Sequence, residues 1–386
     1  MPDPRRLTSE PLCAALAAAR EVTLSRALDL SDEQWLVPRD PRIQPTYWDL
    51  AHIGWFAEAW VLRGPHRLRR DGFVEAAQPG RFFVEDAHLD SAIVAHADRW
   101  RPPAHSREQL LQRLAAQLAA VTQRVRSDDG DPDTTYFARL SLYHECMHAE
   151  ALAWTRASCG YPAPPGVRMP EVAAATRLRV PAGEHAIGSE LDGTFAFDNE
   201  MPQHGVALGA FSIDSHPVRN DAFLAFVDDG GYRRAELWPD GAPDRAMPER
   251  WRRAADGSVE HRHYDRWLPL PPAEPVVHVD AFEAEAYCRW AGRRLPTAAE
   301  WEVASAHGMT WGHSVWEWTA DTFAPYGQGF RPGPYVTYSA PWFHHQRELR
   351  GGAYTTDACL HDRRYRNFFL PGRTDVFAGF RTASSA

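Results

Sequence analysis

The histidine pair His144 and His148 constrains this chain more than any other feature of its sequence. The stretch 136–154, YFARLSLYHECMHAEALAW, has apolar residues at intervals of three and four, which predicts a helix with one buried side. Residues four apart project from the same face of a helix, so we expect both imidazoles one turn apart on that face. Two neutral imidazoles on an otherwise apolar face form half of a site for zinc, iron, copper or nickel. The pattern therefore favours metal binding over two structural histidines.

A third metal ligand is expected on another helix. The stretch 46–63, TYWDLAHIGWFAEAWVLR, has the same helical pattern, contains His52, and is followed by the helix-ending pair Gly64-Pro65. Helical bundles build metal sites from side chains on facing helices, so His52 could join His144 and His148. For His52 alone, a hydrogen-bonded core histidine is an equally good interpretation. Three imidazoles on one side of a metal would leave positions open for a substrate and O2.

The residues 144–148, HECMH, also fit the HExxH motif of zinc hydrolases, in which Glu145 would be the general base. Such a hydrolase needs another ligand further along the chain. The next histidine is His185, and Glu150 projects from a different face of the helix than the two histidines. An HExxH zinc hydrolase is therefore an alternative that the sequence leaves open.

The chain changes character at the segment 160–166, GYPAPPG, whose composition is that of a linker. Long helical patterns precede it, and short alternating segments divided by Gly, Pro and Asp follow it. We predict an N-terminal up-down helical bundle at residues 1–165 and an irregular α+β domain at residues 166–386. Further helices are expected at 8–29 with Ser9 as a cap, 86–100, 106–126 with a Ser106–Gln109 capping box, 220–228 and 281–292, and strands at 178–180, 206–208 and 211–213.

Composition and charge exclude several classes of protein. The net charge of −9 argues against nucleic acid as the main partner. No apolar run reaches membrane-spanning length, and residues 1–20 lack the core of a signal peptide, so a cytoplasmic protein is expected. The five cysteines are widely spaced, which predicts reduced thiols without a structural disulfide. We expect a monomer or a weak dimer.

Aromatic residues, arginines and paired glycines gather near the C-terminus. The motifs are WEWTAD at 316–321, LRGGAY at 349–354, RYRNFF at 364–369 and FAGFRT at 377–382. Aromatic faces could hold a quaternary ammonium group, and an arginine could bind a carboxylate. For most of these residues the core of a loop-rich domain is the competing interpretation, and Tyr326 and Asn367 are our candidates for pocket residues.

Together these motifs resemble the nonheme-iron sulfoxide synthases of ergothioneine biosynthesis (EgtB-like), a family that includes a selenoneine synthase (SenA) branch. The segments AHIGWF at 51–56 and HECMHAEA at 144–151 resemble a DinB-type four-helix bundle. The C-terminal motifs, with FDNE at 197–200, FVDDGGY at 226–232 and AYCRWAGRRLPTAAEWE at 286–302, resemble the formylglycine-generating-enzyme fold, which is C-type-lectin-like. The resemblance spans nearly the whole chain.

The resemblance implies an Fe(II)- and O2-dependent synthase that forms a C–S or C–Se bond at the imidazole C2 of hercynine. His52, His144 and His148 would hold the iron, and Tyr326 would donate a proton or hydrogen atom beside it. The substrate residues that it implies are Asn367, Phe368, Phe369, Trp318 and Arg366.

The donor of the sulfur or selenium is a further expectation. In relatives that use γ-glutamylcysteine an acidic residue follows the asparagine-aromatic pair, whereas Phe369 stands there in this chain. This difference favours a less charged donor, and the Phe368–Phe369 wall would suit a selenosugar, as in the selenoneine branch. An ergothioneine sulfoxide synthase that uses cysteine or γ-glutamylcysteine is the alternative. Cys359 has no cysteine neighbour in the C-terminal sequence, so formylglycine generation is not expected. A DinB-type binding module that consumes no O2 is a third possibility.

Overall fold

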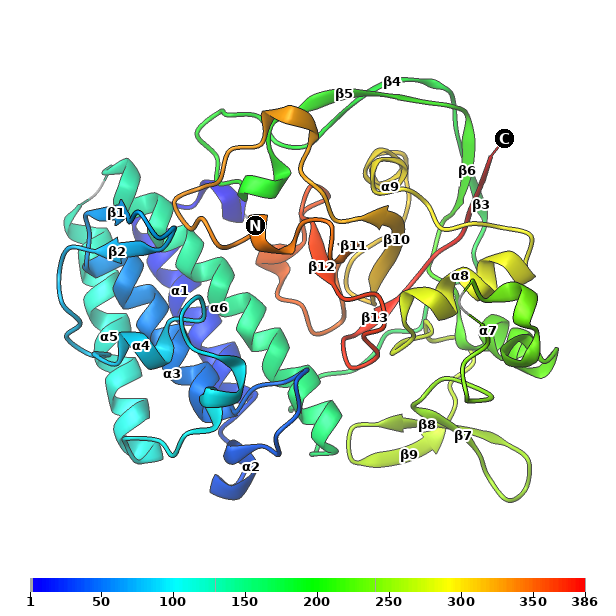
Figure 1. Cartoon of the computed structure of the whole chain (residues 1–386), viewed down its shortest axis with the longest axis horizontal. Helices are drawn as coiled ribbons and strands as arrows, with labels where there is room; N and C mark the ends of the chain where they lie inside the picture. The colour runs from blue at the N-terminus through cyan, green and yellow to red at the C-terminus, as the bar shows by residue number, and fades with distance from the viewer. Residues whose placement is uncertain (1–2, 129, 240, 386) are drawn as a thin grey trace.

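A helical bundle and a mixed domain of short strands lie side by side (Figure 1). The computed structural model describes residues 3–128, 130–239 and 241–385. The helices of the bundle half are α1 (Ser9–Ser25), α2 (Asp32–Leu36), α3 (Thr46–Ala57), α4 (Asp86–Leu89), α5 (Arg107–Ser127) and α6 (Pro132–Cys159). A small hairpin of β1 (His66–Leu68) and β2 (Val74–Ala76) belongs to the same half. The fold class predicted from the sequence is confirmed.

Helix α6 is the element that carries two of the histidines and faces the second half (Figure 1). It spans 28 residues, from an Asp131 cap that accepts the Thr134 N–H at 2.7 Å to Gly160, which has the left-handed φ of 68°. Because a helix turns about 100° per residue, neighbouring positions of α6 face different partners. His144 contacts α3, Glu145 contacts α1, and Glu150 contacts the second half.

Helix α3 ends in a π-helical turn, Glu58–Leu62. The Glu58 carboxylate is buried and accepts the backbone N–H groups of Phe82 and Phe83. This contact holds the segment after the β1–β2 hairpin against α3, where a Cβ on Gly54 would lie 2.4 Å from the Phe83 ring. The close approach of the two segments therefore requires glycine at that position.

The second half is made of short strands and three helices. Its helices are α7 (Asn220–Asp228), α8 (Ala281–Trp290) and α9 (Ala298–Ser305). Its strands are β3 (Arg177–Val180), β4 (Gly183–Ile187), β5 (His204–Leu208), β6 (Phe211–Asp214), β7 (Trp251–Arg253), β8 (Val259–His263), β9 (Arg266–Pro269), β10 (Trp316–Thr322), β11 (Arg347–Gly351), β12 (Asn367–Phe369), β13 (Ala378–Gly379) and β14 (Ala383–Ser385). They form sheets of order β12-β11-β10-β13, β14-β6-β3, β4-β5 and β7-β8-β9. Within the first sheet β10 and β13 are parallel, and the other pairs are antiparallel.

Short 3-10 segments connect these elements. They are Pro4–Arg6, His96–Trp100, Asp198–Glu200, Gly231–Arg233, Ala235–Leu237, Gly327–Gly329, Ala340–Trp342 and Ala358–Leu360. The first of them brings Arg5 to Glu200 of the second half, where the two side chains form two hydrogen bonds of 2.6 and 2.7 Å. The start of the chain is thus fixed to the second half.

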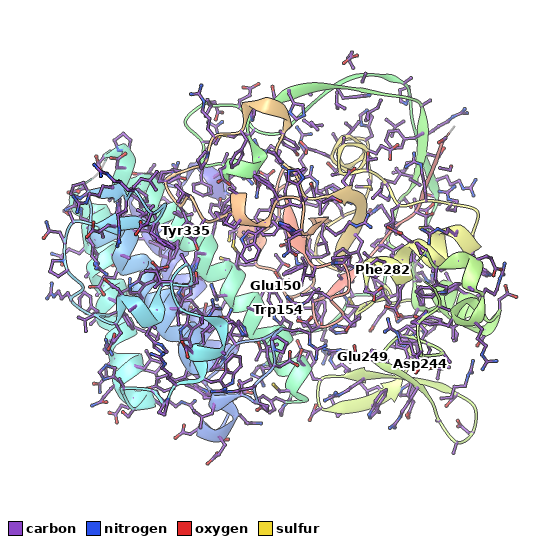
Figure 2. The ribbon with its side chains drawn as sticks, viewed as in Figure 1. Glu150, Trp154, Asp244, Glu249, Phe282 and Tyr335 are labelled. Carbon is purple, nitrogen blue, oxygen red and sulfur yellow. The ribbon has the colours of Figure 1, made fainter. Side chains whose placement is uncertain are left out.

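The interface between the halves is polar as well as aromatic. The buried Glu150 of α6 accepts the Trp316 indole N–H at 2.9 Å and the Thr356 hydroxyl at 2.8 Å. Figure 2 shows Glu150 and Trp154 on the side of α6 that faces the second half. The same figure shows Tyr335, from the loop between β10 and β11, lying over the bundle. Both halves therefore contribute to the region around α6.

Most predicted helices and strands are present, and some of their ends differ. The helix expected at 8–29 is shorter, because α1 ends at Ser25. Thr8 occupies the cap position predicted for Ser9, whose φ is 45°. The helix expected at 86–100 is divided into α4 and a 3-10 segment. The predicted domain boundary at 165/166 falls between α6 and β3 and stays a prediction. No helix of the described residues is both long and apolar enough to cross a membrane.

Candidate metal centre

The three histidines predicted as metal ligands meet at one point. The Nε2 atoms of His52 on α3 and His144 on α6 are 3.1 Å apart. The ring centroids of His52 and His148 are 4.9 Å apart, and those of His144 and His148 are 4.4 Å apart. One ligand atom from each of the three lies within 4.8 Å of the others. His52 and His144 are buried, and His148 is half-buried.

The spacing of these nitrogens fits a shared metal ion. Two nitrogens that are each about 2.1 Å from one ion lie about 3.1 Å apart when the angle between them is roughly 95°. That angle is close to the one between neighbouring positions of a six-coordinate ion. Three ligands on one face would leave other positions of such an ion open, as in nonheme-iron oxygenases.

The other ring nitrogens are held by the protein. His52 Nδ1–H donates to the Leu89 carbonyl oxygen at 2.6 Å, and His148 Nδ1–H donates to Asp49 Oδ1 at 2.9 Å. These bonds leave the Nε2 lone pairs of both rings available for a metal, which is the usual arrangement around metal-binding histidines. Asp49 lies three residues before His52, so its place on the same helical face could have been predicted.

Aromatic rings enclose the histidines. Trp48 stacks on His52 at 4.6 Å, and Phe56 stacks on His144 at 3.6 Å with nearly parallel planes. Burial lowers the pKa of His52 and of His144 well below the ordinary value of 6.5. Both rings are therefore neutral near pH 7, which is the form that binds a metal.

Glu145 does not have the surroundings of a hydrolase base. Its carboxylate is buried on the side of α6 that faces α1, where Arg20 donates to it at 2.6 and 3.2 Å. Both oxygens are thus engaged by a guanidinium, and neither faces the three histidines. The HExxH alternative lacks its general base in this structure.

Tyr326 lies away from the three histidines in the contacts that the structure shows. Its ring packs at 4.6 Å from His204 and under the Arg366 guanidinium at 4.0 Å, both in the second half. Its hydroxyl is buried without a hydrogen-bond partner in the described part of the chain. No contact described for Tyr326 reaches His52, His144 or His148.

Tyr335 is the tyrosine that the structure brings toward the histidines. Its ring centroid is 5.2 Å from that of Phe56, the ring that stacks on His144. Burial raises the pKa of its hydroxyl, and Ser91 and Thr337 are the nearby polar side chains that oppose this rise. Tyr335 could not be predicted from the sequence, because it belongs to a loop whose path depends on the interface between the halves.

Two of the residues implied for the substrate pocket belong to the core of the second half. The Trp318 indole is fully buried and donates to the Val279 carbonyl oxygen at 2.9 Å. The buried Arg366 donates to the Glu348 carboxylate at 2.6 and 3.1 Å and to the Ala324 carbonyl oxygen at 2.7 Å. Neither side chain keeps a free group for a substrate, so we assign both to the core.

Asn367, Phe368 and Phe369 form the edge strand β12 and are half-buried. Phe369 contacts Trp154 of α6 edge-to-face at 5.7 Å, and Figure 2 shows Trp154 on the side of α6 that faces the second half. Asn367 Oδ1 accepts the Phe368 N–H at 2.9 Å. Strand β12 therefore lies at the interface between the two halves and contacts α6, the helix that carries His144 and His148.

A cavity of about 440 Å³ adjoins the aromatic shell of the histidines. Trp55 and Tyr335 line it, and the Trp55 ring is also stacked 5.8 Å from His52. The remaining wall comes from α3, the β1–β2 hairpin and the segment 86–93. The cavity is large enough for a small organic substrate.

Comparison with known proteins matches each half of the chain to a known domain family. Residues 15–152 match the DinB superfamily, and residues 167–314 match the sulfatase-modifying factor enzyme 1-like domain. The hercynine oxygenase of Mycolicibacterium thermoresistibile is 33% identical, over 96% of this chain and 94% of the relative. That of Mycolicibacterium smegmatis is 31% identical, over 98% and 99%. The formylglycine-generating enzyme of Streptomyces coelicolor is 29% identical over 58% of this chain and 96% of its own length. The chain therefore belongs to the EgtB-like hercynine oxygenase family of oxidoreductases.

Proposed function

We propose that this protein is a nonheme Fe(II), O2-dependent synthase that forms a C–Se or C–S bond at the imidazole C2 of hercynine. The meeting of His52, His144 and His148 at one point is the observation that carries the proposal. The nearly full-length similarity to hercynine oxygenases supports the choice of reaction and of hercynine as the substrate. We further propose a selenosugar as the donor, with a thiol donor as the alternative.

His52, His144 and His148 would hold the iron through their Nε2 atoms. Bound iron would supply the activation of O2 that the inert imidazole C2–H requires. Three neutral ligands leave the site more positive than two histidines and a carboxylate would, which favours an anionic thiolate or selenolate beside it. The aromatic rings of Trp48 and Phe56 keep water away from the ligands.

Tyr335 would donate the proton or hydrogen atom that the reaction in this site requires. Its hydroxyl has Ser91 and Thr337 as polar neighbours, and its O–H would donate to the reacting group. Burial raises the pKa of Tyr335, which keeps the phenol protonated at neutral pH. We therefore propose Tyr335, rather than Tyr326, as the proton or hydrogen-atom donor.

Hercynine would contact the interface between α6 and β12. The half-buried rings of Trp154 and Phe369 could receive its trimethylammonium group through their faces. Asn367, at the start of β12, has a side-chain amide that could bind the substrate once its contact with Phe368 rearranges. These roles for Asn367, Phe368 and Phe369 are proposals.

The charges of the cavity support an uncharged donor. Arg63 in its wall is already paired with Asp86 at 2.7 Å, and Arg69 is paired with Asp71 at 2.6 Å. Asp90 has no ion-pair partner among the described residues, and burial raises its pKa. The two carboxylates of γ-glutamylcysteine would find no unpaired cation there.

The aromatic part of the same wall fits a sugar. Trp55, Trp60, Phe73 and Tyr335 offer flat apolar surfaces against which a sugar ring can pack, and Asp90 can accept a bond from a hydroxyl. The donor would then lie between the cavity and the histidines, because Trp55 lines the cavity and contacts His52, and Tyr335 lines it and contacts Phe56.

The test is O2 consumption by the Fe(II)-reconstituted protein with hercynine and, in turn, a selenosugar, cysteine and γ-glutamylcysteine. We expect O2 uptake that requires hercynine and is fastest with the selenosugar, and a product mass that contains selenium. Fastest uptake with a thiol donor would replace the selenoneine assignment with an ergothioneine sulfoxide synthase. Absence of uptake with every donor, despite bound iron, would reject the synthase and leave a binding module.

Asp90→Arg gives a matched test of the donor site, with Glu21→Arg on the exposed side of α1 as its control. A new cation in the cavity should raise the KM for the selenosugar and lower that for γ-glutamylcysteine, each at least about tenfold. Unchanged KM values for both donors would show that the donor binds elsewhere. A cytoplasmic location and a monomer or weak dimer stay predictions of the sequence.

A further inference from the structure

Cys146 and Cys359 are far apart in the sequence and adjacent in the structure. Their Sγ atoms are 2.8 Å apart, although 213 positions separate the two residues. Cys146 belongs to α6, and Cys359 belongs to the 3-10 segment Ala358–Leu360 of the second half. Both are free cysteines. The sequence predicts isolated thiols, whereas the fold pairs these two across the interface.

The spacing of the two sulfurs is short for a metal chelate. Two thiolates on one tetrahedral zinc ion, each about 2.3 Å from it, would be about 3.7 Å apart. Asp357 lies within ligand distance of the pair, but its Oδ1 already accepts the Cys359 N–H at 2.9 Å. The described residues supply no fourth ligand to this group. The geometry is closer to the approach of two sulfurs before bond formation.

We propose that Cys146 and Cys359 form a disulfide under oxidising conditions and so join the bundle covalently to the second half. The proposal is independent of the donor and of hercynine, because it depends only on the contact between the two thiols. Hydrogen peroxide is the oxidant, a two-electron acceptor that O2-consuming enzymes encounter when turnover is incomplete.

The greater exposure of Cys359 sets the order of the reaction. Cys359 is half-buried, whereas only 2% of Cys146 is exposed, so peroxide reaches Cys359 first. The Cys359 sulfur attacks one peroxide oxygen, the O–O bond breaks, and a sulfenic acid and one water form. The Cys146 thiol then displaces the sulfenic hydroxyl, which leaves as a second water when the S–S bond forms. Two thiols are oxidised by two electrons, and one peroxide is reduced to two waters.

The bond would connect the helix that carries His144 and His148 to the loop that follows β11. Glu150 already links the same two segments through its hydrogen bond to Thr356. A covalent link would limit separation of the halves and restrict the unfolded chain over a long loop. We expect the unfolding midpoint of the oxidised protein to rise by about 5 °C.

The test uses the full-length protein treated with a small excess of hydrogen peroxide, then alkylated in denaturant and digested with trypsin without reductant. We expect peptides 140–156 and 351–363 to appear linked, two hydrogens lighter than their sum, and to separate on reduction. Each of these peptides contains one cysteine, so the mass identifies the pair.

Cys159→Ser, which replaces another half-buried cysteine of α6, is the matched control and should keep the link. Cys359→Ser should lose both the link and the rise in the unfolding midpoint. Alkylation of both Cys146 and Cys359 after peroxide treatment would overturn the proposal. Oxidation of Cys359 to a sulfinic acid with Cys146 still free would overturn it too, as would a zinc ion retained by the pair in native mass spectra.

Discussion

Asp49 is the residue that orients a metal ligand most directly, since it accepts the His148 Nδ1–H at 2.9 Å and is itself fully buried. Asp49→Ala should weaken Fe(II) binding about 10- to 100-fold, because His148 loses the partner that fixes its ring. Titration of the metal-free protein with Fe(II) under anaerobic conditions measures the affinity. Asp49→Asn keeps an acceptor oxygen and should recover part of the loss, while Asp90→Ala should have no effect. Equal affinities for the wild type and Asp49→Ala would refute this role.

Tyr335 and Tyr326 make a second comparison between single residues. Tyr335→Phe should lower the rate of product formation about 100-fold or more while Fe(II) still binds, because it removes the proposed proton donor. Tyr326→Phe should stay within about twofold of the wild type, since its ring contacts only second-half residues. Product formation under saturating substrates gives both rates. The reverse pattern would restore Tyr326 as the catalytic tyrosine.

For single residues, the sequence identifies side chains that could bind a metal better than it predicts whether an aromatic residue or an arginine lies in a pocket or in the core. His52, His144 and His148 could be found because helical spacing determines which side chains share a face. Trp318 and Arg366 could not be placed from the sequence, because aromatic residues and arginines are common both in pockets and in the core of a loop-rich domain. Only the contacts of Trp318 with Val279 and of Arg366 with Glu348 distinguish the two.

At the scale of the element, α6 divides its faces among three partners. One face carries the metal ligands, another carries Glu145 in a buried ion pair with Arg20 of α1, and a third carries Glu150 toward the second half. The hydrogen bonds of Glu145 and Glu150 therefore fix the rotation of α6 about its axis. This rotation determines where His144 and His148 point.

The ion pair between α1 and α6 gives a stability prediction. Glu145→Gln should destabilise the protein by about 3–5 kcal/mol, because it leaves the buried Arg20 without its charge partner. The double variant Arg20→Met with Glu145→Leu should recover most of this loss, and Glu21→Gln on the exposed side of α1 is the control. Urea unfolding measures all three variants against the wild type. A loss below about 1 kcal/mol for Glu145→Gln would show that the pair contributes little.

Glu150 gives the pH prediction for the contact between α6 and the second half. Burial raises its pKa above the ordinary value of 4.5. Its contribution to stability is therefore complete below about pH 4.5 and is lost as the pH rises through the folded-state pKa, because folding then requires uptake of a proton. Glu150→Gln can still accept from Trp316 and Thr356 without titrating. The unfolding midpoint of Glu150→Gln should rise relative to the wild type between pH 4.5 and 7, and a pH-independent difference would contradict this.

At the scale of the whole molecule, local elements of both halves could be predicted, whereas the strand order of the second half could not. The helix at 220–228 has the predicted bounds, and the Ser106–Gln109 capping box is present. Both follow from local sequence. The sheet order β12-β11-β10-β13 joins strands of two to seven residues from distant parts of the chain, and such pairings have no local signal.

The candidate site depends both on local sequence patterns and on contacts between distant parts of the chain. The proposed metal ligands come from two bundle helices, while Tyr335 and β12 come from the second half. The position of Tyr335 depends on how the two halves pack, so the histidines could be predicted and their neighbours could not. The placement of Cys359 beside Cys146 has the same origin.

The central claim is that His52, His144 and His148 together hold one iron that supports hercynine-dependent O2 consumption. The most direct measurement determines bound iron per chain and hercynine-dependent O2 uptake in the wild type, His52→Ala and a folded Glu145→Gln sample. We predict one iron per wild-type chain, loss of iron and of uptake in His52→Ala, and retention of both in Glu145→Gln. One iron per chain and undiminished hercynine-dependent O2 uptake in His52→Ala would contradict the claim.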